Sequence, residues 1–414
     1  MFRRLCRRGA VNVASPAFTD VKLTEAAVRR AGKQVQVKFS DGSEFLMHGL
    51  WLRDACRDAY FVSESAGERY LDKIVFKASG AHADGCVKET RVVDGSLEAD
   101  WAWLEPYSGF AGVPAPDLRC KALFKNQGIP DQFQHREFES VMTSEEANLE
   151  MLQSLMKHGV IIMDNVTPAE DASVLLHFAN QCLGGMQKDP ARESPNWIIQ
   201  KKESAKSVSY AQTVRLNNHT DQSVAAHGVP ALLLVVNYVH GTGCNTLVDG
   251  YAVAEALRER DPAAFKLLST YGNCQERDFI RSRVDSAQEG TQTMLITTKQ
   301  PIIQTDPAGG IVRIQYNEVF RTPSTVPFEH FEEWYRAYTL FNEMIHGPEF
   351  EVQVPIGKGQ MLILDNWRVL HGRAGGKSSH DRVIMGGTVV REAFHSRAIR
   401  LMGAQYPVSD YVDL

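Results

Sequence analysis

Long apolar runs, closely spaced cysteines and blocks of a single charge are all scarce in this 414-residue sequence. The longest apolar run, residues 229–239, is interrupted by Pro230 and Asn237 and is too short to span a bilayer, which argues against a membrane protein. The formal net charge is −5 and no long basic block occurs, which argues against a dedicated nucleic-acid-binding protein. The remaining composition, 43% hydrophobic and 23% charged, is typical of a soluble globular chain, here long enough for two domains.

The seven cysteines are scattered, odd in number and without a CxxC pair, which indicates free thiols in a reducing compartment. The first nineteen residues contain four arginines and no acidic residue. An arginine-rich, acid-poor start is typical of a mitochondrial transit peptide, but a disordered basic segment has the same composition. We expect a mitochondrial location, with the cytoplasm as the alternative.

Local patterns divide the chain into four segments. These are a basic N-terminal segment at 1–19, a small β-rich domain at 20–115, a linker at 116–140 and a larger domain at 141–414. In the small domain, residues 34–39 alternate with a period of two, and the hairpin signal Asp41-Gly42 follows them. Residues 114–117, with two prolines, then break the pattern and mark the linker.

The larger domain begins with helices and continues as many short strands. A capping box at residues 143–146 predicts a helix that ends at Gly159, and a second box at 167–170 predicts a helix to about residue 183. Short β-like runs then alternate with loops and with two helices, at about 253–260 and 328–345. Many short strands with few βαβ units favour a mainly β jelly roll or barrel with flanking helices.

His219 and Asp221 are the first candidate metal ligands. Side chains two residues apart on a strand point to the same face, so this pair can reach one ion. An imidazole and a carboxylate suit Fe(II), and a second imidazole would complete a facial triad with three open positions. Because an H-x-D pair often arises by chance, the context at residues 365–373 matters. There His371 follows the strand-like run 360–364.

Three segments, residues 219–221, 241–251 and 365–373, resemble the γ-butyrobetaine and trimethyllysine dioxygenase family, which belongs to the TauD-like superfamily. Residues 50–56 are similar to the start of that family's small N-terminal domain. The resemblance covers the chain from about residue 34. It implies a double-stranded β-helix (jelly-roll) oxygenase domain behind a small β domain. It also implies Fe(II), 2-oxoglutarate and O₂ as cofactor and cosubstrates, with ascorbate as a candidate reductant.

The resemblance assigns His219, Asp221 and His371 to the iron. It places Arg382 against the distal carboxylate of 2-oxoglutarate, which a guanidinium can hold through two parallel hydrogen bonds. Thr246 matches a hydroxyl position that assists this arginine. The alternatives for these last two residues are a surface strand arginine and an ordinary strand threonine.

The substrate pocket matches the family less completely. A trimethylammonium group is held by aromatic faces, and Trp197 and Tyr210 match two such cage positions. Asn317 matches a residue that reads the carboxylate end of the substrate. Two cage tyrosines are replaced, one by Glu193 and one by Thr388. The alternative for Trp197 and Tyr210 is core packing, and the exact substrate stays open.

We therefore expect an Fe(II)- and 2-oxoglutarate-dependent dioxygenase of the carnitine-biosynthesis type, which hydroxylates a small cationic amino acid or betaine and releases succinate and CO₂. The expected partner is this small molecule, with no nucleic acid and no membrane, and a homodimer is implied by the resemblance only. One alternative is the same chemistry on a sulfonate or phosphonate. The other is a catalytically silent binding module, against which the intact triad argues.

No structural zinc is expected. The family's zinc site uses three cysteines and a histidine, but Asp58 and Phe61 stand here in place of two cysteines, so that only Cys56 remains. His82 and Cys86 lie nearby without a zinc-ligand spacing. Metal analysis of the iron-free protein should therefore find far less zinc than protein, whereas stoichiometric zinc that resists dialysis would contradict the prediction.

Overall fold

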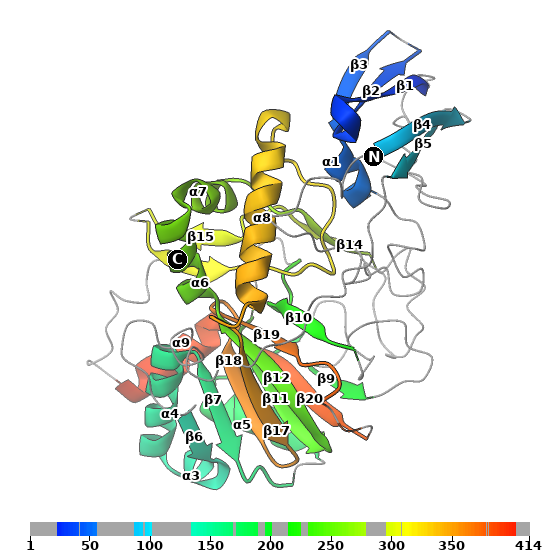
Figure 1. Cartoon of the computed structure of the whole chain (residues 1–414). Coiled ribbons are helices and arrows are strands. Elements are labelled where there is room, and N and C mark those ends of the chain that lie inside the picture. Colours follow the sequence, from blue (N-terminus) through cyan, green and yellow to red (C-terminus); the bar gives the residue numbers. More distant parts are fainter. Residues whose placement is uncertain are drawn as a thin grey trace.

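The computed structural model describes residues 23–40, 42–55, 87–93, 96–101, 134–168, 171–188, 195–200, 214–224, 231–278, 295–307, 309–377, 379 and 381–402. A small β unit near the N-terminus lies above a larger part built on two sheets (Figure 1). The end of the expected small domain and most of the expected linker fall outside these residues. The four-segment division of the chain therefore stays a prediction.

The small unit is an antiparallel sheet next to a hairpin. Its elements are β1 (Leu23–Arg29), η1 (Arg30–Gly32), β2 (Gln34–Phe39), β3 (Glu44–His48), α1 (Gly49–Ala55), β4 (Val87–Val93) and β5 (Ser96–Trp101). Strands β2 and β3 pair with Lys38 opposite Glu44, which confirms the predicted hairpin, and Gly42 adopts a φ of 83° in its turn. Two side chains attach this unit to the larger part: Trp51 donates to the carbonyl of Ser324 at 3.1 Å, and His48 stacks on Phe328.

Two facing sheets form the centre of the larger part. The seven-stranded sheet consists of β6 (Gln134–Glu137), β7 (Val160–Asp164), β18 (Met361–Asp365), β11 (Ala231–His240), β20 (Val383–Val390), β8 (Met186–Gln187) and β9 (Asn196–Gln200). The four-stranded sheet has the order β10 (Leu216–His219), β19 (Val369–Arg373), β12 (Thr242–Asp249) and β17 (Val352–Gly357). Two short hairpins complete the strands, β13 (Gln275–Asp278) with β14 (Leu295–Thr298) and β15 (Ile303–Thr305) with β16 (Ile311–Ile314).

Alternating side chains divide each sheet into an inner and an outer face. Ile162 and Leu364 of the large sheet meet Val354 and Leu247 of the small sheet in one buried cluster between them. Their neighbours in sequence, such as Ile161 and Ile363, belong to a second cluster on the outside of the large sheet. Successive side chains on a strand point to opposite faces. A strand with buried apolar residues at successive positions, such as β7 or β18, is therefore covered on both of its faces. This arrangement confirms the predicted jelly roll.

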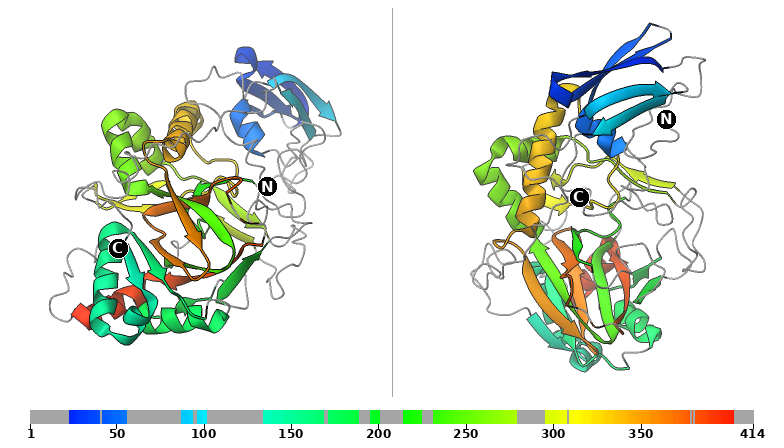
Figure 2. Two further views of the ribbon diagram at one scale, coloured as in Figure 1. Left: turned by 60° about the horizontal axis from the view of Figure 1, so that its bottom comes forward. Right: turned by 45° about the vertical axis from the view of Figure 1, so that its right-hand side comes forward.

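Helices cover the roll from two directions (Figure 2). The outside of the large sheet is covered by α3 (Phe138–Thr143), α4 (Glu145–His158), α5 (Ala172–Cys182) and α9 (Arg391–Met402). A further cluster joins α6 (Gly250–Arg260), α7 (Pro262–Thr270) and α8 (Phe331–His346), the last preceded by η5 (Phe328–His330). No helix in the described ranges is both long and apolar enough to cross a membrane.

Capping residues explain which predicted helix boundaries are confirmed and which are wrong. Ser144 caps α4 by accepting from Ala147 N at 3.2 Å, and Gly159 ends that helix in the left-handed conformation, as predicted. The helix predicted from residue 167 starts later, because Asp171 is the residue that caps it. Helix α7 was missed although Asp261, followed by proline at the first helical position, is a strong start signal.

Candidate active site

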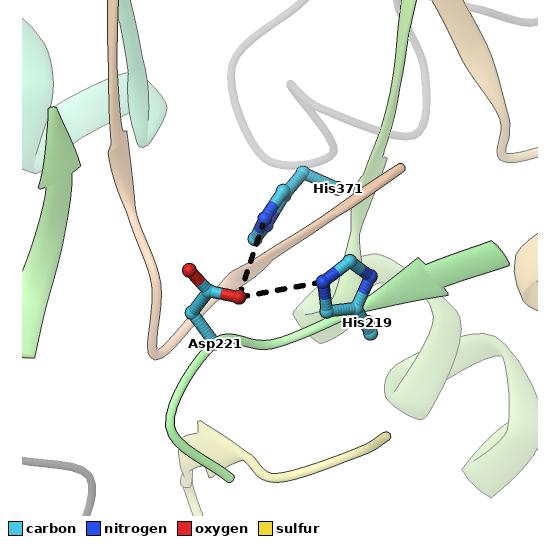
Figure 3. Close-up of side chains that lie close together, drawn as sticks. All are labelled: His219, Asp221 and His371. Carbon is cyan, nitrogen blue, oxygen red and sulfur yellow. Dashed lines mark ion pairs between the residues drawn. The ribbon is translucent and has the colours of Figure 1, made fainter. Parts of the chain in front are cut away.

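The side chains of His219, Asp221 and His371 converge on one point (Figure 3). Strands β10 and β19 pair so that the two histidines lie directly opposite each other, with ring centroids 4.5 Å apart. Asp221 lies just beyond the end of β10, in a turn rather than on the strand. Its Oδ1 is 3.4 Å from His219 Nε2 and 3.8 Å from His371 Nε2.

Two clamps that the sequence reasoning missed hold the turn carrying Asp221. The side chain of Asn366, which is fully buried, accepts from Asp221 N at 2.9 Å and donates to Asp221 O at 3.0 Å. On the preceding residue, Thr220 N donates to Tyr316 O at 2.8 Å, and Tyr316 N donates to Thr220 Oγ1 at 3.1 Å. The backbone of the turn that carries the carboxylate is therefore fixed by two reciprocal hydrogen-bond pairs. The motif around residue 366 was the available signal for one of them.

Both imidazoles turn one ring nitrogen towards Asp221. His219 Nδ1 lies 2.8 Å from the carbonyl of Asn217 and donates to it, so Nε2 is the ring nitrogen that is left to bind a metal. Burial, together with the neighbouring His219, lowers the pKa of His371 to about 3. Because metals bind the deprotonated imidazole, a histidine that is neutral at physiological pH loses no proton when a metal arrives.

The three side chains fit a metal ion. Their candidate ligand atoms all lie within 4.8 Å of one another. Adjacent ligands about 2.1 Å from a metal are roughly 3 Å apart, so the two observed separations from Asp221 need only small side-chain rotations to close. This donor set consists of two imidazoles and one carboxylate. It suits non-haem Fe(II), on which it would leave coordination positions open.

A strongly basic region lies on the same inner face. Arg382, immediately before β20, and Arg373, two residues after His371, are each 3% exposed. Burial and the charge of Arg382 lower the pKa of Arg373 to about 10. A Cβ atom on Gly243 would be 3.1 Å from both Arg382 Cδ and the hydroxyl oxygen of Tyr238, so glycine leaves room for the guanidinium. Two buried guanidiniums that feel each other's positive charge favour a bound anion, which would offset that charge. Sequence reasoning identified Arg382 but not Arg373.

Thr246 does not share this face. On β12, Leu247 pairs with His371 and Thr246 pairs with Gly372, so the threonine points to the opposite side of the sheet. Its hydroxyl donates to Asn218 Oδ1 at 2.6 Å. Asn245, one residue earlier, shares the face of His371 and donates to the hydroxyl of Tyr238 at 2.8 Å. The structure therefore places an amide, not the threonine hydroxyl, on the side of the arginines.

The substrate residues are only partly described. Trp197 lies on β9 opposite Gly386 and packs against the cluster between the sheets. On β20, Thr388 is two residues from Gly386, on the same face, and its hydroxyl lies 3.4 Å from Gln222 Nε2. Asn317 is 4% exposed and directly follows the Tyr316 clamp. Glu193 and Tyr210 lie outside the described residues, as do Cys56, His82 and Cys86 of the zinc prediction.

This chain is similar to one protein family and to several known proteins. A profile of the family described as "Taurine catabolism dioxygenase TauD, TfdA family" matches residues 125–388. The gamma-butyrobetaine dioxygenase of Homo sapiens is 27% identical over 355 residues, which cover 82% of this chain and 86% of that protein. The mitochondrial trimethyllysine dioxygenase of Gallus gallus is 25% identical over 358 residues, 83% of this chain and 80% of that protein. A similar solved structure, "Crystal structure of AAD-2 in complex with Mn(II) and N-oxalylglycine", has a TM-score of 0.44 and 14% identity, and covers 63% of this chain and 96% of that chain.

The family profile and the two curated relatives confirm the resemblance drawn from the sequence motifs, and with it the dioxygenase class and the use of Fe(II) and 2-oxoglutarate. The profile includes the strands that carry the triad and covers more than half of the sequence. The chain therefore belongs to the TauD, TfdA family of dioxygenases.

Proposed function

We propose that this dioxygenase hydroxylates a small cationic amino acid or betaine of the γ-butyrobetaine or trimethyllysine type, as in carnitine biosynthesis. The observation that carries the oxygenase chemistry is the convergence of two imidazoles with one carboxylate, whose turn is held by buried hydrogen bonds. The cationic substrate rests on the names of the relatives, which are similar over more than three quarters of the chain. The reaction would release succinate and CO₂ with the hydroxylated product.

We propose His219, Asp221 and His371 as the iron ligands. When bound, Fe(II) supplies the oxidising chemistry that couples decarboxylation of 2-oxoglutarate to hydroxylation of a C–H bond. The protein contributes geometry and charge. Its reciprocal hydrogen bonds hold the backbone of the turn that carries the carboxylate. Its single anionic ligand would leave the iron centre net positive, which favours an anionic cosubstrate.

The distal carboxylate of 2-oxoglutarate is assigned to Arg382. A buried guanidinium offers a planar pair of donors, and nearby Arg373 adds positive charge where the cosubstrate carries negative charge. We assign the neighbouring polar contact to Asn245 in place of Thr246, because Asn245 faces the arginines whereas the hydroxyl hydrogen of Thr246 is already donated to Asn218.

The substrate end is assigned to Trp197, Tyr210, Glu193 and Asn317. An aromatic face attracts a quaternary ammonium by roughly 1–2 kcal/mol when the contact is desolvated. Thr388 offers a hydroxyl on the inner face where the family pattern has a ring, so fewer aromatic walls surround the cation. A pocket with two rings and one carboxylate should therefore discriminate less sharply between methylation states than a fully aromatic cage.

A mitochondrial location and a homodimer are part of the same proposal. Support for the location comes from the arginine-rich first nineteen residues and from the relatives named mitochondrial. The second candidate function is hydroxylation of a sulfonate or phosphonate, which the taurine-catabolism description of the family favours. A catalytically silent binding module is the weaker alternative, because every element of the triad and its clamps is present.

Replacing His219, Asp221 or His371 by alanine should abolish both Fe(II) binding and 2-oxoglutarate turnover, because each variant removes one of three ligands. Metal content after anaerobic loading and succinate release are the measurements. His240→Ala is a matched control, since its exposed imidazole pairs with Asp381 on the surface and should leave both unchanged. Full iron binding by the His371→Ala protein would refute the ligand assignment.

Arg382→Lys keeps the positive charge but loses the planar fork of donors. It should raise the KM for 2-oxoglutarate at least tenfold, about 1.4 kcal/mol, with little change in iron affinity. Arg336→Lys, which alters only a surface pair with Asp261, provides the control. An unchanged KM would place the cosubstrate carboxylate elsewhere.

Variants of the pocket test the substrate class. Glu193→Tyr should shift preference towards the trimethylated substrate, because it adds an aromatic face. Trp197→Ala should weaken every cationic substrate, whereas Ile198→Ala, the exposed neighbour on the other face of β9, should not. Competition kinetics with methylation-state analogues measure both effects. If a neutral or purely anionic substrate turns over best, the sulfonate or phosphonate function replaces this one.

A further inference from the structure

The residue before the first histidine ligand is fixed through its backbone N–H and both ends of its side-chain amide. Asn218 is 1% exposed. Its backbone N–H donates to His346 Nε2 at 3.0 Å, and its side-chain Nδ2 donates to Ile345 O at 2.8 Å and to Glu351 Oε2 at 2.7 Å. Its Oδ1 accepts from Thr246 Oγ1 at 2.6 Å. A buried amide this completely hydrogen-bonded cannot shift without leaving donors or acceptors unsatisfied.

Gly372, the residue after the second histidine ligand, packs against the same group of residues. A Cβ atom on Gly372 would lie 2.4 Å from Leu216 O, 2.6 Å from Thr246 Oγ1 and 2.9 Å from Asn218 Oδ1. Only glycine therefore lets β10, β19 and β12 approach this closely on their outer face. The contacts lie on the side of the sheet opposite the triad, one residue away from each imidazole in the sequence.

The end of α8 anchors this group. His346 Nδ1 lies 2.8 Å from the carbonyl of Asn342, four residues earlier in the helix, so Nδ1 is the donor and Nε2 the acceptor. Burial lowers the pKa of His346 to about 3, which keeps that acceptor available. Glu351 also forms a short ion pair with Arg215, next to β10. The ligand-bearing strand is thus tied to a long buried helix.

We propose that Asn218, Thr246, Gly372, His346 and Glu351 form an outer-face lattice that positions the two imidazoles before the metal arrives. The inference rests on the proposed iron site. Displacing β10 relative to β19 would break several buried hydrogen bonds and leave their donors and acceptors unsatisfied, which opposes the displacement. The lattice therefore holds His219 opposite His371, and metal affinity depends on residues that do not touch the metal.

Metal binding to the full-length, metal-free protein tests the lattice without relying on activity. Co(II) is the probe, followed by its visible absorption and by calorimetry. Asn218→Ala and Thr246→Val should each weaken Co(II) binding about tenfold or more, the range expected for residues that support metal ligands. Thr246→Ser keeps the donor hydroxyl and should restore wild-type affinity.

Asn148→Ala is the matched control for Asn218→Ala. Asn148 is also 1% exposed and also donates to a buried carbonyl, that of Cys182 at 3.1 Å, while its Oδ1 accepts from Arg397. It lies on α4, on the outside of the large sheet. Both substitutions should lower the melting temperature, but only Asn218→Ala should also lower Co(II) affinity.

Thr246→Val also separates the lattice from a direct role of Thr246 in cosubstrate binding. The lattice predicts weaker Co(II) binding with an unchanged KM for 2-oxoglutarate at saturating metal. A direct contact predicts the reverse. Wild-type affinity in both Thr246→Val and Asn218→Ala, with metal binding still lost in His371→Ala, would overturn the lattice and leave the iron site intact. Wild-type protein that binds no Co(II) would overturn the proposed iron site and the lattice with it.

Discussion

The pairing of β10 with β19 is the constraint on which the site depends. It sets His219 opposite His371 although the two residues are far apart in the sequence, and it leaves Asp221 in a turn that can fold back between them. The turn is then fixed by the side chain of Asn366 and by the backbone of residue 316. A three-ligand centre thus needs only one strand pair and one clamped turn.

The two faces of the four-stranded sheet present different kinds of residue. The inner face holds the imidazoles, Arg373 and Asn245, and so gathers the groups that can bind a metal and an anion. On the outer face, Asn218 and Thr246 join the strands to one another and to the end of α8. Because neighbours on a strand point to opposite faces, a residue next to a ligand in sequence is well placed to support that ligand without touching it.

A buried ion pair supports the segment that carries Asn317, a proposed substrate residue. Glu318 and Arg321 are each 2% exposed and lie 3.9 Å apart. Tyr316 donates to the carboxylate at 2.8 Å, and the guanidinium lies 4.6 Å from the ring centroid of Tyr338 on α8. Breaking such a pair leaves an uncompensated buried charge, which costs about 3–5 kcal/mol. These contacts therefore tie the segment that contains Asn317 to α8.

The sequence by itself determined the jelly-roll class, the helix at residues 145–158 and the identity of the three candidate ligands, because strand alternation, capping signals and motifs are local in the chain. It did not determine which neighbour on β12 faces the arginines, and the family resemblance pointed to Thr246. That choice depends on register, since a shift of one residue reverses the face of every side chain on a strand. The register of β12 is set by its pairing with β19 and β17, which lie more than a hundred residues further along the chain. Only the tertiary structure brings these strands together, and it alone shows where Arg373, Asn366 and Asn218 lie relative to the three candidate ligands.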